Sequence, residues 1–292
     1  SVRHYNGEPA NRSSFFKFQD VVDDIKDTTD MIKKYIPRME VTGAVNVSER
    51  AAGNLRAEDI LKYTTVSGID FDRENKKNFG EFRKVDSTEK LKLQSLAANH
   101  CAIYHGFNDR LMYKKGDEVQ VRLSLWHGNE HHQKKINLTV DKIFDYNLKW
   151  PASYRGKNLI VVDIDTLHQV FGEDEFGGRC NKLILSFGSS EIYDVRNVDQ
   201  SEQQVKDLAA DINKKLGLEE YNIDLPKLEI LEYSEFLSMG ITIIFIFVSI
   251  VAMLIAGILI NGILKTSVEE RIREFGIFRT LGAYKNFNLA VV

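Results

Sequence analysis

The feature that most constrains the fold is an uncharged apolar run, Ile241–Leu264, near the C-terminal end of the 292-residue chain. No residue between Glu235 and Lys265 carries a formal charge. A helix of about 24 residues rises about 1.5 Å per residue and covers roughly 36 Å, more than the hydrocarbon core of about 30 Å in a bilayer. The run therefore predicts a membrane span over residues 238–265, in preference to a buried helical hairpin of a large soluble protein.

The charges on the two sides of the run predict its orientation. Three glutamates precede the run and five lysines or arginines follow it: Glu229, Glu232, Glu235, then Lys265, Arg271, Arg273, Arg279 and Lys285. An excess of Lys and Arg near a span marks its cytoplasmic side. We therefore expect residues 1–237 to form an extracytoplasmic domain and residues 266–292 to form a cytoplasmic helix and the start of the next transmembrane segment, with the chain in a plasma or inner membrane.

An exterior domain has to be carried across the membrane by a signal sequence or an earlier span. The opening residues contain no initiator Met and no apolar stretch, and Asn288–Val292 begins a new apolar run. We expect the chain to be a segment of a longer polypeptide, preceded by one span and followed by others. The number of spans in that polypeptide is left open.

The sequence before the span predicts a mixed α+β fold. Alternating apolar residues predict strands at Met39–Val47, Lys62–Asp70, Cys101–His105, Glu118–Trp126, Lys135–Tyr146, Asn158–Asp163, Lys182–Phe187 and Tyr221–Leu231. Helical spacing predicts helices at Phe15–Ile36, Ser87–Asn99, Ile164–Phe171 and Ser201–Leu216, the first ended by Pro37 and the last capped by Ser201, and a helical turn at Phe107–Tyr113.

Several residue clusters in this region contain side chains that could form a chemical site. His127, His131 and His132 lie close to Glu130, but the polar setting favours an exposed hairpin loop over a zinc site. The histidines at 100, 105 and 168 are interpreted as core residues, and the charged run at residues 70–84 as a solvated face. Cys101 and Cys180 are compatible with one disulfide or with two buried thiols. None of these clusters predicts a catalytic site or a metal site.

Two further observations exclude classes of function. The net charge of -3 gives no indication of nucleic acid binding. The chain has no GxxxxGK[ST] loop to bind phosphates, and the glycine pair Gly177–Gly178 lacks the required lysine. The sequence therefore predicts that the chain is not an ATPase and binds no cofactor of its own.

The charged segment after the span, Ser267–Ala283, predicts a separate short helix. Ser267 and Glu270 have the spacing of a capping box, and glutamates in the first turn favour the helix dipole. Gly276 should interrupt this helix. The helix should carry an apolar patch among its charged residues. Such a patch is expected to contact a protein or a lipid headgroup layer; it consists of Phe275, Ile277, Phe278 and Leu281.

The segment reads SVEERIREFGIFRTLGA and resembles the part of FtsX-like permeases, the membrane subunits of MacB-type and LolC-type ABC transporters, that follows their second span. Upstream, GFNDRLMYKKGDEVQV, INLTVDKIFDY and LIVVDIDTLHQVFG are similar to successive elements of the family's exterior domain, in the same order. The resemblance implies a MacB-type periplasmic core domain of two α/β subdomains. The chain departs from the family pattern by lacking the first span and the last two.

In these permeases the corresponding segment is a coupling helix that docks on a cytoplasmic ATPase. Carried over to this sequence, the docking residues are Ser267, Glu269, Glu270, Arg271, Arg273, Glu274, Phe275, Gly276, Arg279 and Gly282. The resemblance implies that ATP and Mg²⁺ bind to a partner ABC-type ATPase, and that the permease works as a homodimer or heterodimer in contact with membrane lipid.

Two hypotheses of function follow. The first is a permease subunit that couples ATP hydrolysis by its partner to movement of the exterior domain, for substrate export or extraction or for regulation of a partner. The second is a single-span receptor or adhesion module with a ligand-binding exterior domain. The sequence identifies neither the substrate nor the direction of transport.

Overall fold

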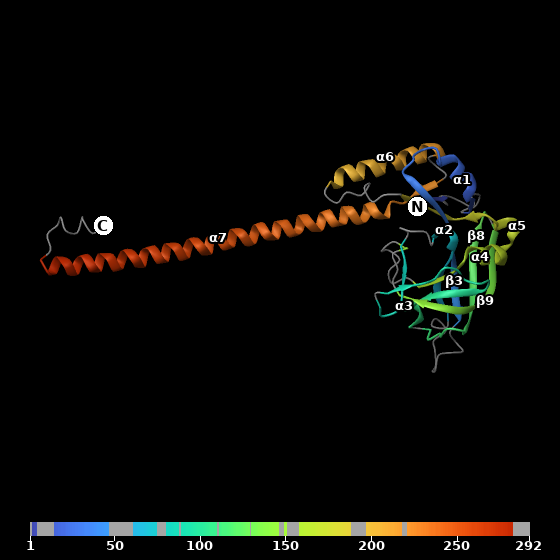
Figure 1. Cartoon of the computed structure of the whole chain (residues 1–292), viewed down its shortest axis with the longest axis horizontal. Helices are drawn as coiled ribbons and strands as arrows, with labels where there is room; N and C mark the ends of the chain where they lie inside the picture. Colours follow the sequence, from blue (N-terminus) through green and yellow to red (C-terminus); the bar gives the residue numbers. More distant parts are fainter. Residues whose placement is uncertain are drawn as a thin grey trace. The chain divides into compact units, whose positions relative to one another are not determined.

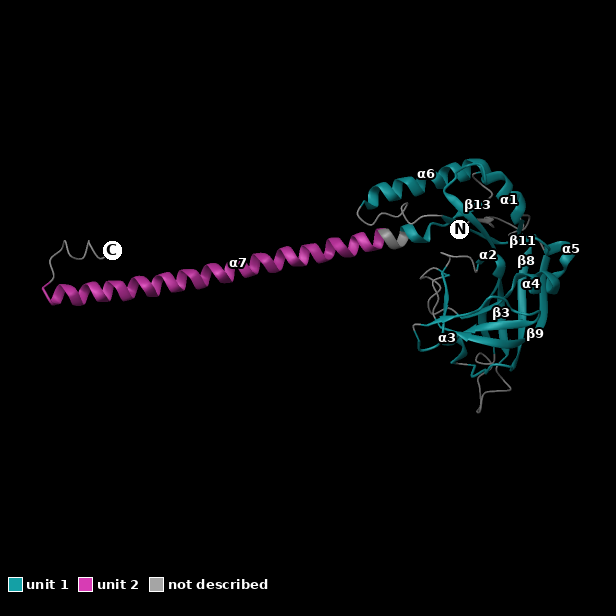
Figure 2. Cartoon of the chain, viewed as in Figure 1, with its two compact units in different colours: residues 1–231 teal, residues 232–292 magenta. Residues whose placement is uncertain are grey.

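A computed structural model of the chain describes residues 2–4, 15–46, 61–74, 80–87, 89–109, 111–128, 130–145, 149–150, 158–187, 197–217 and 221–282. The chain divides into two compact units, Ser1–Leu231 and Glu232–Val292 (Figure 2). The first unit mixes strands and helices, which confirms the α+β class, and the second contains most of one long helix.

The elements follow one another along the chain as shown in Figure 1. The strands are β1 (Val2–His4), β2 (Phe16–Lys17), β3 (Ile32–Asn46), β4 (Leu61–Ile69), β5 (Phe82–Arg83), β6 (Lys90–Leu91), β7 (His100–Tyr104), β8 (Glu118–His127), β9 (Glu130–Phe144), β10 (Leu159–Asp163), β11 (Arg179–Cys180), β12 (Lys182–Phe187) and β13 (Tyr221–Ile223). The helices are α1 (Phe18–Ile25), α2 (Phe71–Glu74), α3 (His105–Asn108), α4 (Ile164–Phe171), α5 (Glu173–Phe176), α6 (Val198–Leu216) and α7 (Pro226–Thr280).

Nine of the described strands form one sheet in the order β13-β1-β12-β3-β4-β10-β7-β9-β8. A further antiparallel pairing joins Thr42–Val45 of β3 to Val121–Ser124 of β8. This pairing closes β3, β4, β10, β7, β9 and β8 into a barrel and leaves β12, β1 and β13 as an extension of the sheet. Strand β3 belongs to both parts, because its residues 32–38 pair with β12 and its residues 38–46 pair with β4.

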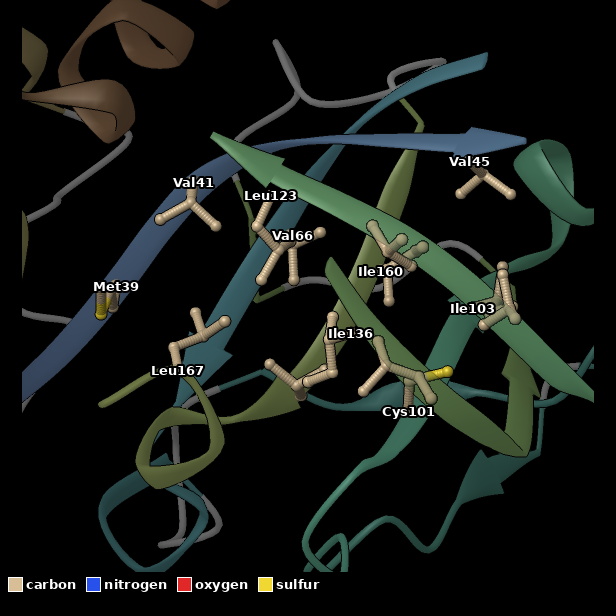
Figure 3. Packing of buried hydrophobic residues seen from close by; sticks show 14 of the residues in the cluster. Met39, Val41, Val45, Val66, Cys101, Ile103, Leu123, Ile136, Ile160 and Leu167 are labelled. Atoms are coloured by element: carbon tan, nitrogen blue, oxygen red, sulfur yellow. The ribbon is translucent and has the colours of Figure 1, made fainter. Parts of the chain in front are cut away.

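Alternate side chains of the barrel strands fill its interior, as expected for a small closed sheet. These side chains form a hydrophobic cluster together with Leu167 of α4. The strand residues labelled in Figure 3 are Met39, Val41, Val45, Val66, Cys101, Ile103, Leu123, Ile136 and Ile160. Gly43 lies where β3 pairs with both β4 and β8, and a Cβ added there would lie 2.7 Å from Cγ2 of Val66. The absence of a side chain at residue 43 therefore permits the close approach of the strands.

Two more hydrophobic clusters lie outside the barrel. One packs α1 and α6 against the sheet extension, with Ile25, Leu183, Leu208 and Ile212 fully or almost fully buried. The other packs Phe71, Phe82, Leu93, Leu96 and Trp150 against the outward-facing side chains of β4, β7 and β10. Three separate apolar clusters thus hold the first unit together.

The structure corrects four of the predicted elements. Residues 15–36 are not one helix: α1 ends at Ile25 and β3 begins at Ile32. Ile32 and Ile36 share a face in a strand as well as in a helix, because a spacing of four residues fits both periods. Pro37 lies inside β3, in the portion paired with β12 alone, where a missing N–H donor is tolerated.

The other three corrections follow from local backbone signals. The described residues of the range 87–99 contain no helix: Lys90–Leu91 is a short strand, and Leu93 and Leu96 pack into the outer cluster. Helix α6 begins at Val198, and its cap is Asn197, whose Oδ1 accepts from the Gln200 amide at 3.3 Å, in place of Ser201. The strand predicted at Tyr221–Leu231 ends at Ile223, since Pro226 opens α7, a position at which proline is favoured.

Candidate functional site: helix α7 and its charged end

Helix α7 contains both the predicted span and most of the predicted docking segment. It runs without interruption from Pro226 to Thr280. It is the one helix of the described residues that is long and apolar enough to cross a membrane, and none of its most apolar stretch is buried within the chain. Its large apolar side chains between Ile241 and Leu264 are exposed around the whole helix. Such a surface is stable in lipid or against other apolar helices.

The separate short helix predicted after the span is not present. Ser267 lies inside α7, so its side chain is not an N-cap, and Glu270 is not part of a capping box. Gly276 does not interrupt the helix either, because its neighbours on both sides are helical. Helical backbone bonds across residues 264–270 make a cap unnecessary, since the amides of an interior turn already have partners.

The helix ends at Thr280, after Arg279 and before Gly282, the last of the predicted docking residues. The amide of Leu281 donates to the carbonyl of Ile277 at 3.1 Å, and the amide of Gly282 donates to the carbonyl of Arg279 at 3.2 Å. Gly282 has a φ of 90°, a conformation that glycine adopts without steric cost at the end of a helix. Ala283 and Lys285 lie outside the described residues.

Continuity of α7 fixes how the docking residues share its surface. Val268, Ile272 and Phe275 are spaced by four and three residues and therefore lie on one face. Val268 and Ile272 are 55% and 64% exposed, and Phe275 is half-buried. Val268 and Ile272 are not among the predicted docking residues, because a new helix was expected to begin at Ser267, whereas the helical period of the apolar run continues through it.

The remaining predicted docking residues surround this apolar face. Exposed charged side chains are carried by Glu269, Glu270, Arg271, Arg273, Glu274 and Arg279. Ile277 and Leu281 are 52% and 78% exposed. A Cβ added at Gly276 would meet no atom within 4 Å. The end of α7 is thus an exposed surface that combines apolar side chains with charges of both signs.

In the first unit, the histidine cluster does not form the predicted loop. His127 is the last residue of β8, and His131 and His132 lie in β9, with only residues 128–129 between the strands. The His131 ring stacks on Trp126 at a centroid distance of 4.5 Å. Burial lowers the pKa of His127, and the nearby Glu175 carboxylate offsets part of that effect. As the side chains stand, no three His, Cys, Asp or Glu residues in the described ranges converge closely enough to hold a metal ion.

The charged run at residues 70–84 is only partly solvated, because Glu74 is fully buried. Its carboxylate accepts from Arg38 at 2.6 Å (Nε to Oε1) and 3.1 Å (Nη2 to Oε2). Lys149 donates from Nζ to the Glu74 carbonyl at 3.0 Å, and the Arg38 guanidinium lies 4.0 Å from the Trp150 ring centroid. Burial lowers the pKa of Lys149, an effect that the Glu74 carboxylate partly offsets. This buried cluster joins β3, α2 and residues 149–150.

The cysteines and His168 belong to the core. Cys101 and Cys180 are buried free thiols, so the disulfide alternative is excluded. Burial raises the pKa of Cys101 to about 12 and also raises that of Cys180, which keeps both thiols protonated and unreactive at neutral pH. His168 is buried, and its Nε2 lies 2.9 Å from the carbonyl oxygen of Arg179, as expected of a core histidine.

Comparison with known proteins concerns the second unit. Residues 246–292 match a family model described as FtsX-like permease C-terminal. The match begins within the apolar part of α7 and includes the whole charged segment. No curated protein matched the chain.

Proposed function

Because the chain carries the C-terminal part of an FtsX-like permease at residues 246–292, we infer that it is part of the permease subunit of an ABC transporter. The family is embedded in membranes and generally works with a separate ABC ATPase. In this function the chain binds no nucleotide. ATP and Mg²⁺ bind to the partner ATPase, and the permease functions as a homodimer or heterodimer.

The single observation that supports this function best is the unbroken helix α7. Its 55 residues correspond to roughly 80 Å at about 1.5 Å per residue. Residues 241–264 account for a bilayer, and 16 further residues, 265–280, continue beyond them. A helix without a break or an internal proline transmits a displacement at one end to the other with little loss, because bending it requires disrupting backbone hydrogen bonds.

In the proposed mechanism the cytoplasmic ATPase binds the charged end of α7. The face formed by Val268, Ile272 and Phe275 packs against the ATPase, and Glu274 and Arg279 form charged contacts around it. ATP-driven closure of the ATPase shifts the helix, and the shift reaches the exterior domain, for which we propose the role of a MacB-type periplasmic core. The excess of Lys and Arg after the span supports a cytoplasmic location of this end.

The test uses the full-length protein that contains this chain, expressed with its candidate ATPase. Glu274→Lys reverses a charge in the proposed contact, and Gly276→Trp adds a large side chain where the isolated helix has open space. Both variants should lose most of the co-purifying ATPase and the permease-dependent part of ATP hydrolysis.

Two matched controls separate docking from folding. Gly240→Trp makes the same substitution in α7, also where no atom lies within 4 Å, at the opposite end of the apolar run. Glu118→Lys makes the same charge reversal on an exposed residue of β8. Both controls should retain the ATPase. Unchanged association in both docking variants would contradict the proposal.

The second hypothesis, a single-span receptor or adhesion module, makes a different prediction for the whole protein. A receptor would contain one span, whereas a permease would contain four or more, with Ser267–Ala283 between two of them. The full-length sequence distinguishes these two possibilities.

A further inference from the structure

The apolar run of α7 contains three side chains with hydrogen-bonding groups, and two of them are satisfied within the helix. Oγ1 of Thr242 donates to the carbonyl oxygen of Ser238 at 2.9 Å, and Oγ of Ser249 donates to that of Phe245 at 2.8 Å. The third is Asn261, which is exposed and whose side chain has no hydrogen bond to any described residue. The helix therefore leaves the Asn261 amide to find its partner elsewhere.

A bilayer makes this requirement stringent. The run covers roughly 36 Å, so when it is centred on a hydrocarbon core of about 30 Å, Asn261 lies just inside the core on the side of Lys265. Hydrocarbon offers neither donor nor acceptor, and an amide placed there without a hydrogen bond is strongly disfavoured. The amide carries one acceptor oxygen and an NH₂ donor, so a suitable partner offers both functions.

Asn261 shares one face of α7 with a glycine. At 3.6 residues per turn, Leu254, Gly257 and Leu264 lie within about 60° of Asn261 around the helix axis. A Cβ added at Gly257 would meet no atom within 4 Å, so packing within the described chain does not require a glycine there. Glycine weakens a helix interior relative to alanine, and between membrane helices it permits close approach of two backbones. This face is therefore suited to contact with another helix.

We propose that this face of α7 packs against the same face in a second copy of the chain, with the two Asn261 amides hydrogen-bonded to each other. A primary amide is self-complementary, because its oxygen can accept from the N–H of the other copy while its own N–H donates in return. A contact between identical patches across a twofold axis needs no further residue type. In paired helices a single asparagine on the contact face also fixes their register.

Because this contact rests on the proposed permease function, it specifies the permease dimer as a homodimer. It is continuous with the face proposed to bind the ATPase. Asn261, Val268 and Phe275 follow at seven-residue spacing, which drifts by only about 20° per repeat around a helix. The helix pair therefore ends where the ATPase contact begins, and a shift of the docking end acts directly on the paired helices.

The test is disulfide cross-linking of the full-length protein that contains this chain, in membranes of the expressing cells and without the ATPase. Three single variants place a thiol on the proposed face: Leu254→Cys, Gly257→Cys and Leu264→Cys. Three matched controls place a thiol on the opposite face, at residues that are equally exposed within the chain: Ala252→Cys, Leu259→Cys and Ile263→Cys. The unmodified protein, whose Cys101 and Cys180 are buried, gives the background.

Oxidation with copper phenanthroline should join copies through the proposed face. Since a disulfide needs Cβ atoms within about 4.5 Å, these variants should give at least about 5-fold more cross-linked dimer than the controls. Asn261→Leu in the Leu264→Cys background should lower the cross-linked fraction at least about 3-fold, an effect typical of one polar contact between spans. Asn261→Gln keeps the amide and should retain most of the cross-linking.

Equal cross-linking from both faces would overturn the proposal. So would an unchanged cross-linked fraction in Asn261→Leu, because headgroup water would then satisfy the amide. Co-purification of the ATPase is measured separately on the same variants. Loss of face-specific cross-linking with the ATPase retained contradicts the helix contact alone, whereas face-specific cross-linking without ATPase association contradicts the docking function alone.

Discussion

The buried charge cluster around Glu74 allows a quantitative test of the fold. Glu74→Gln keeps the size of the side chain and removes its charge. Arg38 and Lys149, whose side chains are 1% and 3% exposed, then lose the carboxylate that both contact. Removing one partner of a buried ion pair costs about 3–5 kcal/mol, because the remaining charge is neither hydrated nor paired. We expect a loss near the lower value, since the glutamine amide still accepts one hydrogen bond.

The assay is urea unfolding of the full chain in detergent, followed by tryptophan fluorescence. The chain has two tryptophans, and Trp150 is 4% exposed and contacts Arg38. A Trp126→Phe background leaves this single reporter inside the cluster. With a denaturant dependence of about 2–3 kcal/mol per molar urea, a loss of 3 kcal/mol moves the midpoint by about 1 M.

The control breaks an ion pair on the surface. Lys115→Met removes the partner of Asp141, which lies 3.4 Å away with side chains 69% and 30% exposed, and this change should cost less than about 1 kcal/mol. In addition, Arg38→Met combined with Glu74→Gln should cost less than the sum of the single changes, because the two residues contact each other. A Glu74→Gln shift no larger than that of Lys115→Met, or strict additivity in the double variant, would refute this reasoning.

Three further predictions concern packing, capping and the thiols. Gly43→Ala should cost about 1–3 kcal/mol in urea unfolding, because its Cβ would lie 2.7 Å from Val66 Cγ2; an unchanged midpoint would contradict this. Asn197→Ala should cost about 0.5–2 kcal/mol and lower the circular dichroism melting temperature. Iodoacetamide at pH 8 should modify Cys101 only after unfolding, and stability should fall as pH rises from 9 toward 12, because the folded thiol stays protonated while the unfolded one ionises.

Most strands were predictable because their patterns are local. The alternating residues of β8, β10 and β12 predicted the bounds of these strands to within one residue, whereas β9 begins five residues before its predicted start. One kind of error arose where a residue spacing fits both a helix and a strand, as at Ile32 and Ile36. Another arose where a long helix continues through a sequence that resembles a helix start, as at Ser267. In the latter case the capping-box spacing was real, but the helix already extended through it from the span.

The candidate sites differ in how far the sequence revealed them. The span and the charged residues after it are contiguous in the chain, and their hydropathy and charge could be interpreted directly. Glu175 approaches His132, although 43 positions separate them in the sequence. Glu74 is buried against Arg38, from which it is separated by 36 positions. No local pattern indicates such pairs.

The sequence by itself determined a candidate membrane span, its charged continuation and an α+β domain, because hydrophobicity and periodicity act over short stretches of chain. Only the tertiary structure decided that β3 pairs with both β4 and β8 to close a barrel, that Glu74 is buried, and that two histidines face one carboxylate. These features depend on the strand register and on the order of the strands in the sheet. Packing between distant segments sets both, so no single stretch of sequence predicts them.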